Sequence, residues 1–213
     1  MNNPWEVQGR AVQKLSLELP RTGAWTARVS VYGDEPLPAN VTLACQNGGG
    51  PFVGHVSQQT SDRGYVIAQL VGGAGKLNKA VSARGYKNTT SAIVARELAT
   101  EAGELFAANS TASASLAFYA RFASTLSDTL TVLSASTGEP WRITNAGAVF
   151  VGELPAAAHT SSAYFLSRDE SSNSEMYALD YPEFEPSQTF DGKTIASVVY
   201  DLNGSLRAAV YYR

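Results

Sequence analysis

Apolar and polar residues alternate along the first 85 residues of the chain in a series of short runs. Three leucines share one face of the segment Gln13–Leu19, which Pro20 ends, and the same alternation returns over Ala24–Tyr32. Glycine, proline and asparagine turns separate three more runs of this kind, Val41–Cys45, Phe52–Ser57 and Gly64–Val71. Short strands at this spacing predict a small β-barrel or sandwich.

The hydrophobic period changes to that of a helix in the middle of the chain. Apolar positions recur at helical spacing over Ile93–Ala107, and Gly103 within this run favours an early end of the helix. A second helix is expected over Ser124–Thr137, with Gly138 as its C-terminal stop. The segment Leu116–Phe122 between them is expected to be extended.

A β-hairpin is the clearest local element of the sequence. Trp141–Thr144 and Ala148–Gly152 alternate, and the three residues between them, Asn145-Ala146-Gly147, supply the turn. After a small-residue linker, Pro155–Thr160, the pattern predicts four more strands at Tyr164–Leu166, Met176–Leu179, Ile195–Asp201 and Leu206–Tyr212. The last two strands are joined by Asn203-Gly204, a strong turn signal.

These elements predict a mainly β protein with a small α/β insert, in which two small β-barrel-like domains flank a short helix-containing segment. The expected boundaries are an N-terminal β-barrel-like domain at 1–86, an α/β segment with two helices and the hairpin at 87–154, and a C-terminal β-rich, barrel-like domain at 155–213.

Composition excludes several classes of protein. With 44% hydrophobic residues the chain can bury a core, while a net charge of -3 and the lack of a basic run argue against nucleic-acid binding through phosphate contacts. No run approaches the ~18 apolar residues of a membrane span. The first residues lack the basic and apolar regions of a signal peptide, so we expect folding in a cytosol.

Residues for catalysis are scarce. Cys45 is the only thiol, and a nucleophile pair would require it to meet His55 across neighbouring strands, which no local motif supports. We expect His55 to be a structural strand histidine and His159, in the small-residue linker, to be exposed. The turn 72–76 faintly resembles a phosphate-binding loop, but Leu77 stands where a hydroxyl is needed, so a flexible turn is expected. Metal-ligand spacings are missing, and we expect no metal or cofactor site.

Two acidic pairs leave a hydrolase open as an alternative. Glycosidases need two carboxylates roughly 5–10 Å apart, and Asp169 with Glu170 or Glu183 with Glu185 are candidates, although acids in polar loops are usually solvated.

Aromatic residues gather near the C-terminus: Tyr177, Tyr181, Phe184, Phe190, Tyr200, Tyr211 and Tyr212. Exposed, they would suit a glycan-binding module of a tail fibre or adhesin; packed, they would form the core of a small barrel, which is the favoured interpretation.

The order of several short motifs resembles a known family. The runs 17–27, 71–75, 83–86, 101–104, 133–152, 190–199 and 204–207 are similar, in this order, to phage tail hub proteins of the Mu-like and late-control-D-like kind. Among them are Leu17-Glu18-Leu19-Pro20-Arg21-Thr22-Gly23-Ala24-Trp25 and Pro140-Trp141-Arg142-Ile143.

The resemblance implies a structural subunit of the virion tail, of the hub or baseplate kind, with no catalytic residues. Such a subunit assembles as a homo-oligomeric ring, often a trimer, between tube and tip, and its partners would be other tail proteins of the tube, tip or spike, fibre or tape measure. Trp25, Trp141, Tyr211 and Tyr212 are the expected core or interface anchors.

Overall fold

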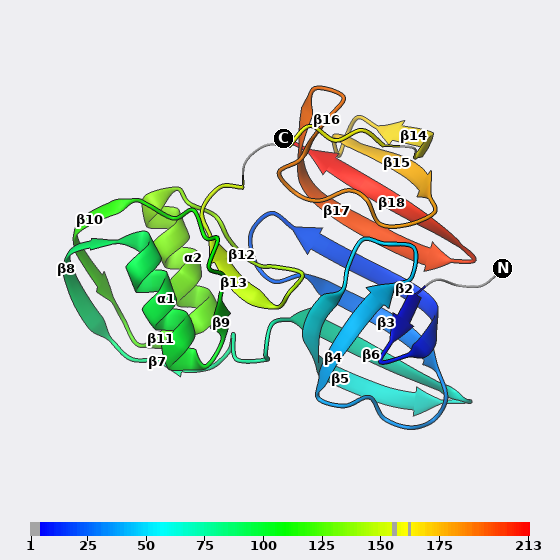
Figure 1. Ribbon diagram of the computed structural model, residues 1–213, viewed down its shortest axis with the longest axis horizontal. Helices are drawn as coiled ribbons and strands as arrows, with labels where there is room; N and C mark the ends of the chain where they lie inside the picture. Colours follow the sequence, from blue (N-terminus) through cyan, green and yellow to red (C-terminus); the bar gives the residue numbers. More distant parts are fainter. Residues whose placement is uncertain (1–4, 155–156, 162) are drawn as a thin grey trace.

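The computed structural model describes residues 5–154, 157–161 and 163–213 (Figure 1). The first residues, on which the signal-peptide prediction depends, fall partly outside this described part, as do residues 155–156 of the predicted linker. Mainly β structure with a small helical insert is confirmed.

Six N-terminal strands form a closed barrel. They are β1 (Trp5–Val7), β2 (Arg10–Pro20), β3 (Thr26–Tyr32), β4 (Asn40–Cys45), β5 (Phe52–Asp62) and β6 (Tyr65–Gly72). Their order is β1-β4-β5-β6-β3-β2, and β1 also pairs with β2, which closes the barrel. The five strands expected from alternation are confirmed, and β1 was missed because three residues are too few for a period.

The barrel interior is filled by the apolar positions of the alternation. Leu15, Leu17 and Leu19 of β2 are buried, whereas the residues between them are exposed. Phe52 lies between two indoles, 6.3 Å from the ring of Trp5 and 5.7 Å from that of Trp25. Large buried rings of this kind contribute much of the apolar area that stabilises a small barrel.

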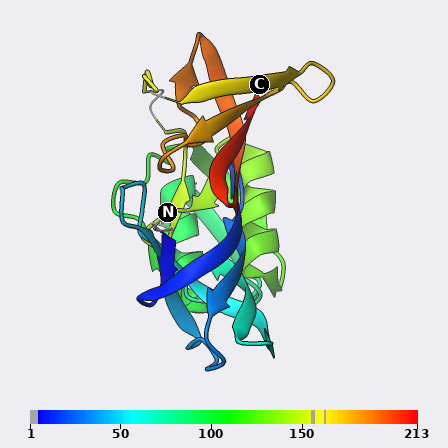
Figure 2. The ribbon, with the colours of Figure 1, turned by 90° about the vertical axis from the view of Figure 1, so that its right-hand side faces the viewer.

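The C-terminal strands continue the same sheet. They are β14 (Tyr164–Asp169), β15 (Ser174–Leu179), β16 (Thr189–Phe190), β17 (Lys193–Asn203) and β18 (Ser205–Tyr212). Because β17 pairs along β2, the order runs on as β2-β17-β18-β15-β14 (Figure 1), and β16 pairs with β17. Figure 2 shows these strands at one end of the molecule and the barrel at the other.

The helical insert lies beside both parts (Figure 1). It holds α1 (Ser91–Ala102) and α2 (Leu126–Thr137), which pack on each other, and the strands β7 (Ala80–Val81), β8 (Arg84–Thr90), β9 (Leu105–Phe106), β10 (Ser115–Arg121), β11 (Ser124–Thr125), β12 (Trp141–Ile143) and β13 (Ala148–Val151). The hairpin β12–β13 is confirmed, and β8 pairs with β10. In the described part, neither helix is long and apolar enough to cross a membrane.

The early end of the first helix at Gly103 is confirmed. Helical structure stops at Ala102, before the end of the apolar run at Ala107, because Gly103 adopts a left-handed conformation with φ of 88° and its N–H donates to the carbonyls of Ala99 and Thr100. Leu105 and Phe106 then form β9, parallel to β13. The second helix ends as expected at Gly138.

The domain boundaries stay a prediction. Strand β8 runs across the expected boundary after residue 86 and pairs only within the insert, whereas the C-terminal strands share a sheet with the barrel.

Candidate functional site

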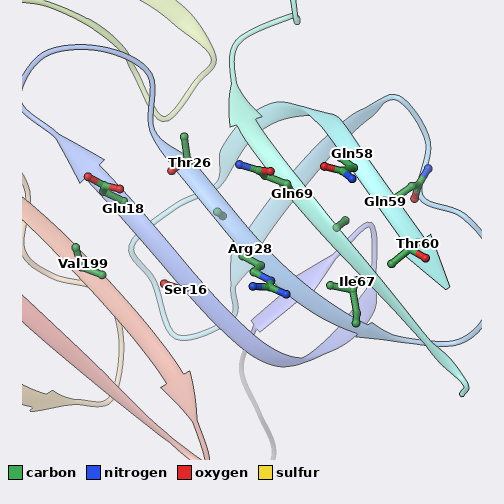
Figure 3. Close-up of a pocket in the computed structure, with 12 residues that line it drawn as sticks. Ser16, Glu18, Thr26, Arg28, Gln58, Gln59, Thr60, Ile67, Gln69 and Val199 are labelled. Atoms are coloured by element: carbon green, nitrogen blue, oxygen red, sulfur yellow. The ribbon is translucent and has the colours of Figure 1, made fainter. Parts of the chain in front are cut away.

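A polar groove covers the outward face of five neighbouring strands, β5, β6, β3, β2 and β17. We call it the outer groove. Two adjoining cavities of about 430 Å³ and about 510 Å³ make it up, and both are lined by Ser16, Arg28 and Ile67. Figure 3 shows Ser16, Arg28 and Gln69 of the first cavity on neighbouring strands of this sheet.

The side chains of the outer groove are the outward-facing residues of the alternating strands whose inward-facing residues fill the barrel. Since successive strand residues face opposite sides, burial of one set exposes the other. Strand pairing aligns the exposed set in a row across the sheet: Gln58, Gln69, Arg28, Ser16, Asp201 and Arg207. The row mixes both charge signs with neutral amides and hydroxyls, so this face is well hydrated. Its polar positions were readable as outward-facing in the sequence, but their joining across β2 and β17 was not.

The same face continues toward the open end of the sheet at β14. Arg207 pairs with Ala178, which pairs with Tyr164 on β14. Tyr164 is 73% exposed and Met176, also on this face, is 37% exposed. Tyr211 lies half-buried on this face, paired with Ser197. An apolar patch therefore adjoins the polar groove at the β14 edge of the sheet, which pairs with no other strand of the described residues.

Trp25 joins the barrel to the insert. Its buried indole lies between Gly54 and Gly72, where an added methyl group would come within 2.7 Å and 2.6 Å of ring atoms. The methyl position at Gly72 is also only 2.9 Å from a side-chain carbon of Ile143, in the hairpin of the insert. The glycines thus allow barrel, indole and insert to meet without a gap.

Backbone bonds fasten the same junction. The N–H of Gly23 donates to the carbonyl of Trp141 at 2.7 Å, and the N–H of Ile143 donates to the carbonyl of Gly23 at 3.1 Å. The Trp141 indole is buried and donates to the hydroxyl of Thr131. Trp25, Trp141 and Tyr212 are thus buried in this chain, and an interface role for any of the four expected anchors remains a proposal.

The glycine-rich turn 72–76 is held by an acid of its own chain. Both carboxylate oxygens of Glu104 accept backbone hydrogen bonds, from Ala74 at 2.8 Å and from Lys76 at 2.6 Å. Glu104 is only 5% exposed. The backbone amides that would cradle a phosphate are therefore occupied, and the expectation of a flexible turn is wrong.

The sulfur and imidazole of the considered nucleophile pair lie far apart. His55 pairs with Asn40 on β4, and Cys45 lies five residues further along the same strand, which corresponds to ~16 Å. Burial raises the pKa of the Cys45 thiol, which disfavours the reactive thiolate. His159 is not exposed as expected: its ring packs against Phe184 and lies 3.7 Å from the carboxylate of Glu183.

The acidic candidates have structural partners. Asp169 accepts hydrogen bonds from Ser171 and Ser172 at the β14–β15 turn, and these bonds lower the pKa of its exposed carboxyl. Glu183 is almost buried against His159, so its expected solvation is wrong, and Glu185 accepts from Asn145 at 3.2 Å. Among the described residues, no group of His, Cys, Asp and Glu could hold a metal ion.

Most C-terminal aromatics are core, as favoured. Tyr177, Phe184, Tyr200 and Tyr212 are buried, and the Tyr200 hydroxyl both donates to and accepts from the backbone of Phe184. Tyr181 is 36% exposed.

A buried carboxylate organises this core. Glu175 accepts from Lys193 at 2.7 Å and from the hydroxyls of Tyr177 and Tyr212 at 2.6 and 2.9 Å. Burial by itself would raise the pKa of Glu175, but these bonds outweigh it and the pKa is lowered. Burial, then the bond to Glu175, raises the pKa of Tyr177 to about 12.

Comparison with known proteins adds the decisive observation at the level of fold. No protein-family model matches the chain, and no curated protein matches it. Among solved structures, a tail protein from Neisseria meningitidis MC58 is similar over 99% of this chain and 96% of its own, with a TM-score of 0.67 and 13% identity. This chain shares the fold of that tail protein.

Two further structures agree over nearly the whole chain. The 43 kDa tail protein of prophage MuSo2 from Shewanella oneidensis has a TM-score of 0.66 and 11% identity, with coverage of 98% of this chain and 96% of the other. The Escherichia coli c3393 protein is described as a type VI secretion system component similar in structure to the T4 tail proteins gp27 and gp5. It has a TM-score of 0.63 and 8% identity, covering 98% of this chain and 76% of the other.

Proposed function

We propose that this chain is a structural subunit of a phage tail, of the hub or baseplate kind, that links tail tube and tail tip through protein–protein contacts. The observation that carries the proposal is the match in fold to tail proteins over 98–99% of the chain, including barrel, insert and C-terminal strands. The ordered sequence motifs of the hub family support the same assignment independently.

A mechanical role fits the chemistry of the described residues better than an enzymatic one. The considered thiol and imidazole lie apart, and three of the four candidate acids serve hydrogen bonds within the fold. We therefore propose that the protein acts by assembly in the virion, after folding in the host cytoplasm.

We further propose that copies meet in a ring, often a trimer in such subunits, through the open β14 end of the sheet. Its exposed Tyr164 and Met176 offer apolar area next to an unpaired strand edge, which is costly to leave free on a monomer. The outer groove mixes charges and amides, so it stays hydrated in the assembly.

The test is the mass of the purified full chain by light scattering over a range of concentrations, with and without tail-tube and tip proteins. A defined oligomer or complex is expected. The double change Tyr164→Asp and Met176→Glu should dissociate it, whereas Arg28→Glu in the outer groove should not. A protein that stays monomeric at high concentration and binds no tail component contradicts the proposal.

A further inference from the structure

A second cavity, of about 550 Å³, lies on the opposite face of the C-terminal sheet from the outer groove. We call it the C-terminal pocket. Its walls include Phe165 of β14, Tyr177 of β15, Phe190 of β16 and the two carboxylates Glu175 and Asp191. It is open to solvent on one side and lies on the face of β14 and β15 opposite Tyr164 and Met176.

The aromatic walls offer one accessible ring surface. Phe165 is 51% exposed, and its ring meets that of Tyr177 edge to face, at 5.8 Å and 72°. Phe190 meets Tyr177 at 5.7 Å and 83°. Buried Tyr177 thereby supports two rings whose own surfaces border the pocket. Such a ring surface suits a flat, weakly polar ligand face.

The polar walls hold these two carboxylates together with the hydroxyls of Thr160 and Ser161 and the imidazole of His159. Asp191 is exposed and has no hydrogen bond or ion pair to any described residue, whereas Glu175 is already bonded to Lys193 and two tyrosines. No lysine or arginine is among the lining residues. A ligand here is recognised through its own hydroxyl or amide donors, and an unpaired carboxylate repels an anion.

From this geometry we infer that the C-terminal pocket is a carbohydrate subsite for a neutral or amino hexose. A sugar ring combines an apolar C–H face, for Phe165, with hydroxyl donors, for Asp191. The inference is independent of the assembly role, and it places any glycan recognition at Phe165 and Asp191 instead of at the buried tyrosines.

The test is a nuclear magnetic resonance titration of the isotope-labelled full chain. Glucose, galactose, N-acetylglucosamine and glucuronate are each added up to ~100 mM. At least one neutral sugar is expected to bind in the millimolar range and to shift amide signals around Phe165 and Asp191. Glucuronate is expected to bind ~tenfold more weakly, because of the unpaired carboxylate.

Two variants and one control separate the subsite from unspecific effects. Phe165→Ala should weaken sugar binding ~tenfold. Asp191→Asn should keep the turn, since Asn tolerates the φ of 48° found here, and should narrow the difference between neutral sugar and glucuronate. Phe118→Ala, a more exposed phenylalanine on β10, should change nothing.

The inference is overturned if no sugar shifts signals around the pocket, or if Phe165→Ala binds as tightly as the unchanged protein. Oligomeric state is measured on the same samples, so failure of the sugar subsite is distinguishable from failure of the tail assembly.

Discussion

A methyl group added at Gly72 tests the junction between the barrel and the insert. Gly72 ends β6, and the methyl carbon of Gly72→Ala would lie 2.6 Å from the indole nitrogen of Trp25 and 2.9 Å from a side-chain carbon of Ile143. Contacts this short force the indole or the hairpin to move. Both are buried, so neither can move into solvent.

The expected cost follows from two opposing effects. Overpacking a well-filled core destabilises by about 1–3 kcal/mol. Replacing glycine by alanine also removes freedom from the unfolded chain, which stabilises by about 0.4–1 kcal/mol where the backbone allows it. The net loss is therefore about 0–2.6 kcal/mol against the unchanged protein, which corresponds to a Tm lower by up to roughly 10 °C for a chain of this size.

The assay is urea and thermal unfolding at one fixed protein concentration, with Gly85→Ala as the matched control. Gly85 also lies in a strand, β8, but an added methyl group there meets nothing within 4 Å and no positive φ intervenes. The control should be as stable as the unchanged protein or slightly more stable. Equal stability of Gly72→Ala and Gly85→Ala would refute the tight packing inferred at Trp25.

Three other changes test separate features. Glu104→Gln should destabilise by about 1–3 kcal/mol and speed hydrogen exchange at Ala74 and Lys76, because an amide offers only one acceptor oxygen to two part-buried backbone N–H groups; unchanged exchange would contradict the role of Glu104 in holding the turn. Tyr177→Phe should shrink the stability lost in alkali, measured by urea unfolding from pH 9 to 12. Because the pKa of Tyr177 is raised in the folded protein, this hydroxyl contributes to the free energy of unfolding. The contribution is complete below pH ~10 and is lost as the pH rises through about 12. The pKa of Glu175 is lowered in the folded protein, so its contribution to the free energy of unfolding is complete above pH ~4.3 and is lost as the pH falls through the lowered value. Glu175→Gln should therefore make the free energy of unfolding depend less on pH in that range. An unchanged pH dependence would contradict the role given to the bonds of Glu175.

The strands and helices could be predicted from the sequence because buried side chains recur at the spacing of each kind of element. The buried leucines of β2 lie at every second position, and the buried residues of α2 lie at helical spacing, so both patterns were visible in the sequence. Gly103 indicated the early end of α1 in the sequence. The strand after it, β9, could not be predicted because it depends on pairing with β13, which is a long-range contact.

The candidate surfaces depend on contacts that no local pattern contains. The outer groove exists because β17 pairs with β2, almost 180 residues earlier in the chain. Glu104 is buried by its bonds to the turn 72–76, about 30 residues earlier in the chain. His159 and Glu183 looked solvated because they stand among small or polar residues, yet Phe184 and Phe190 cover the histidine.

Electron cryo-microscopy of phage tail particles that carry this chain would show whether it is a tail subunit. We expect a ring of identical copies around the tail axis, between tube and tip, with the β14 edge and Tyr164 at the contact between subunits. Absence of the chain from the particles, or its location only in peripheral fibres, would rule out the proposed role.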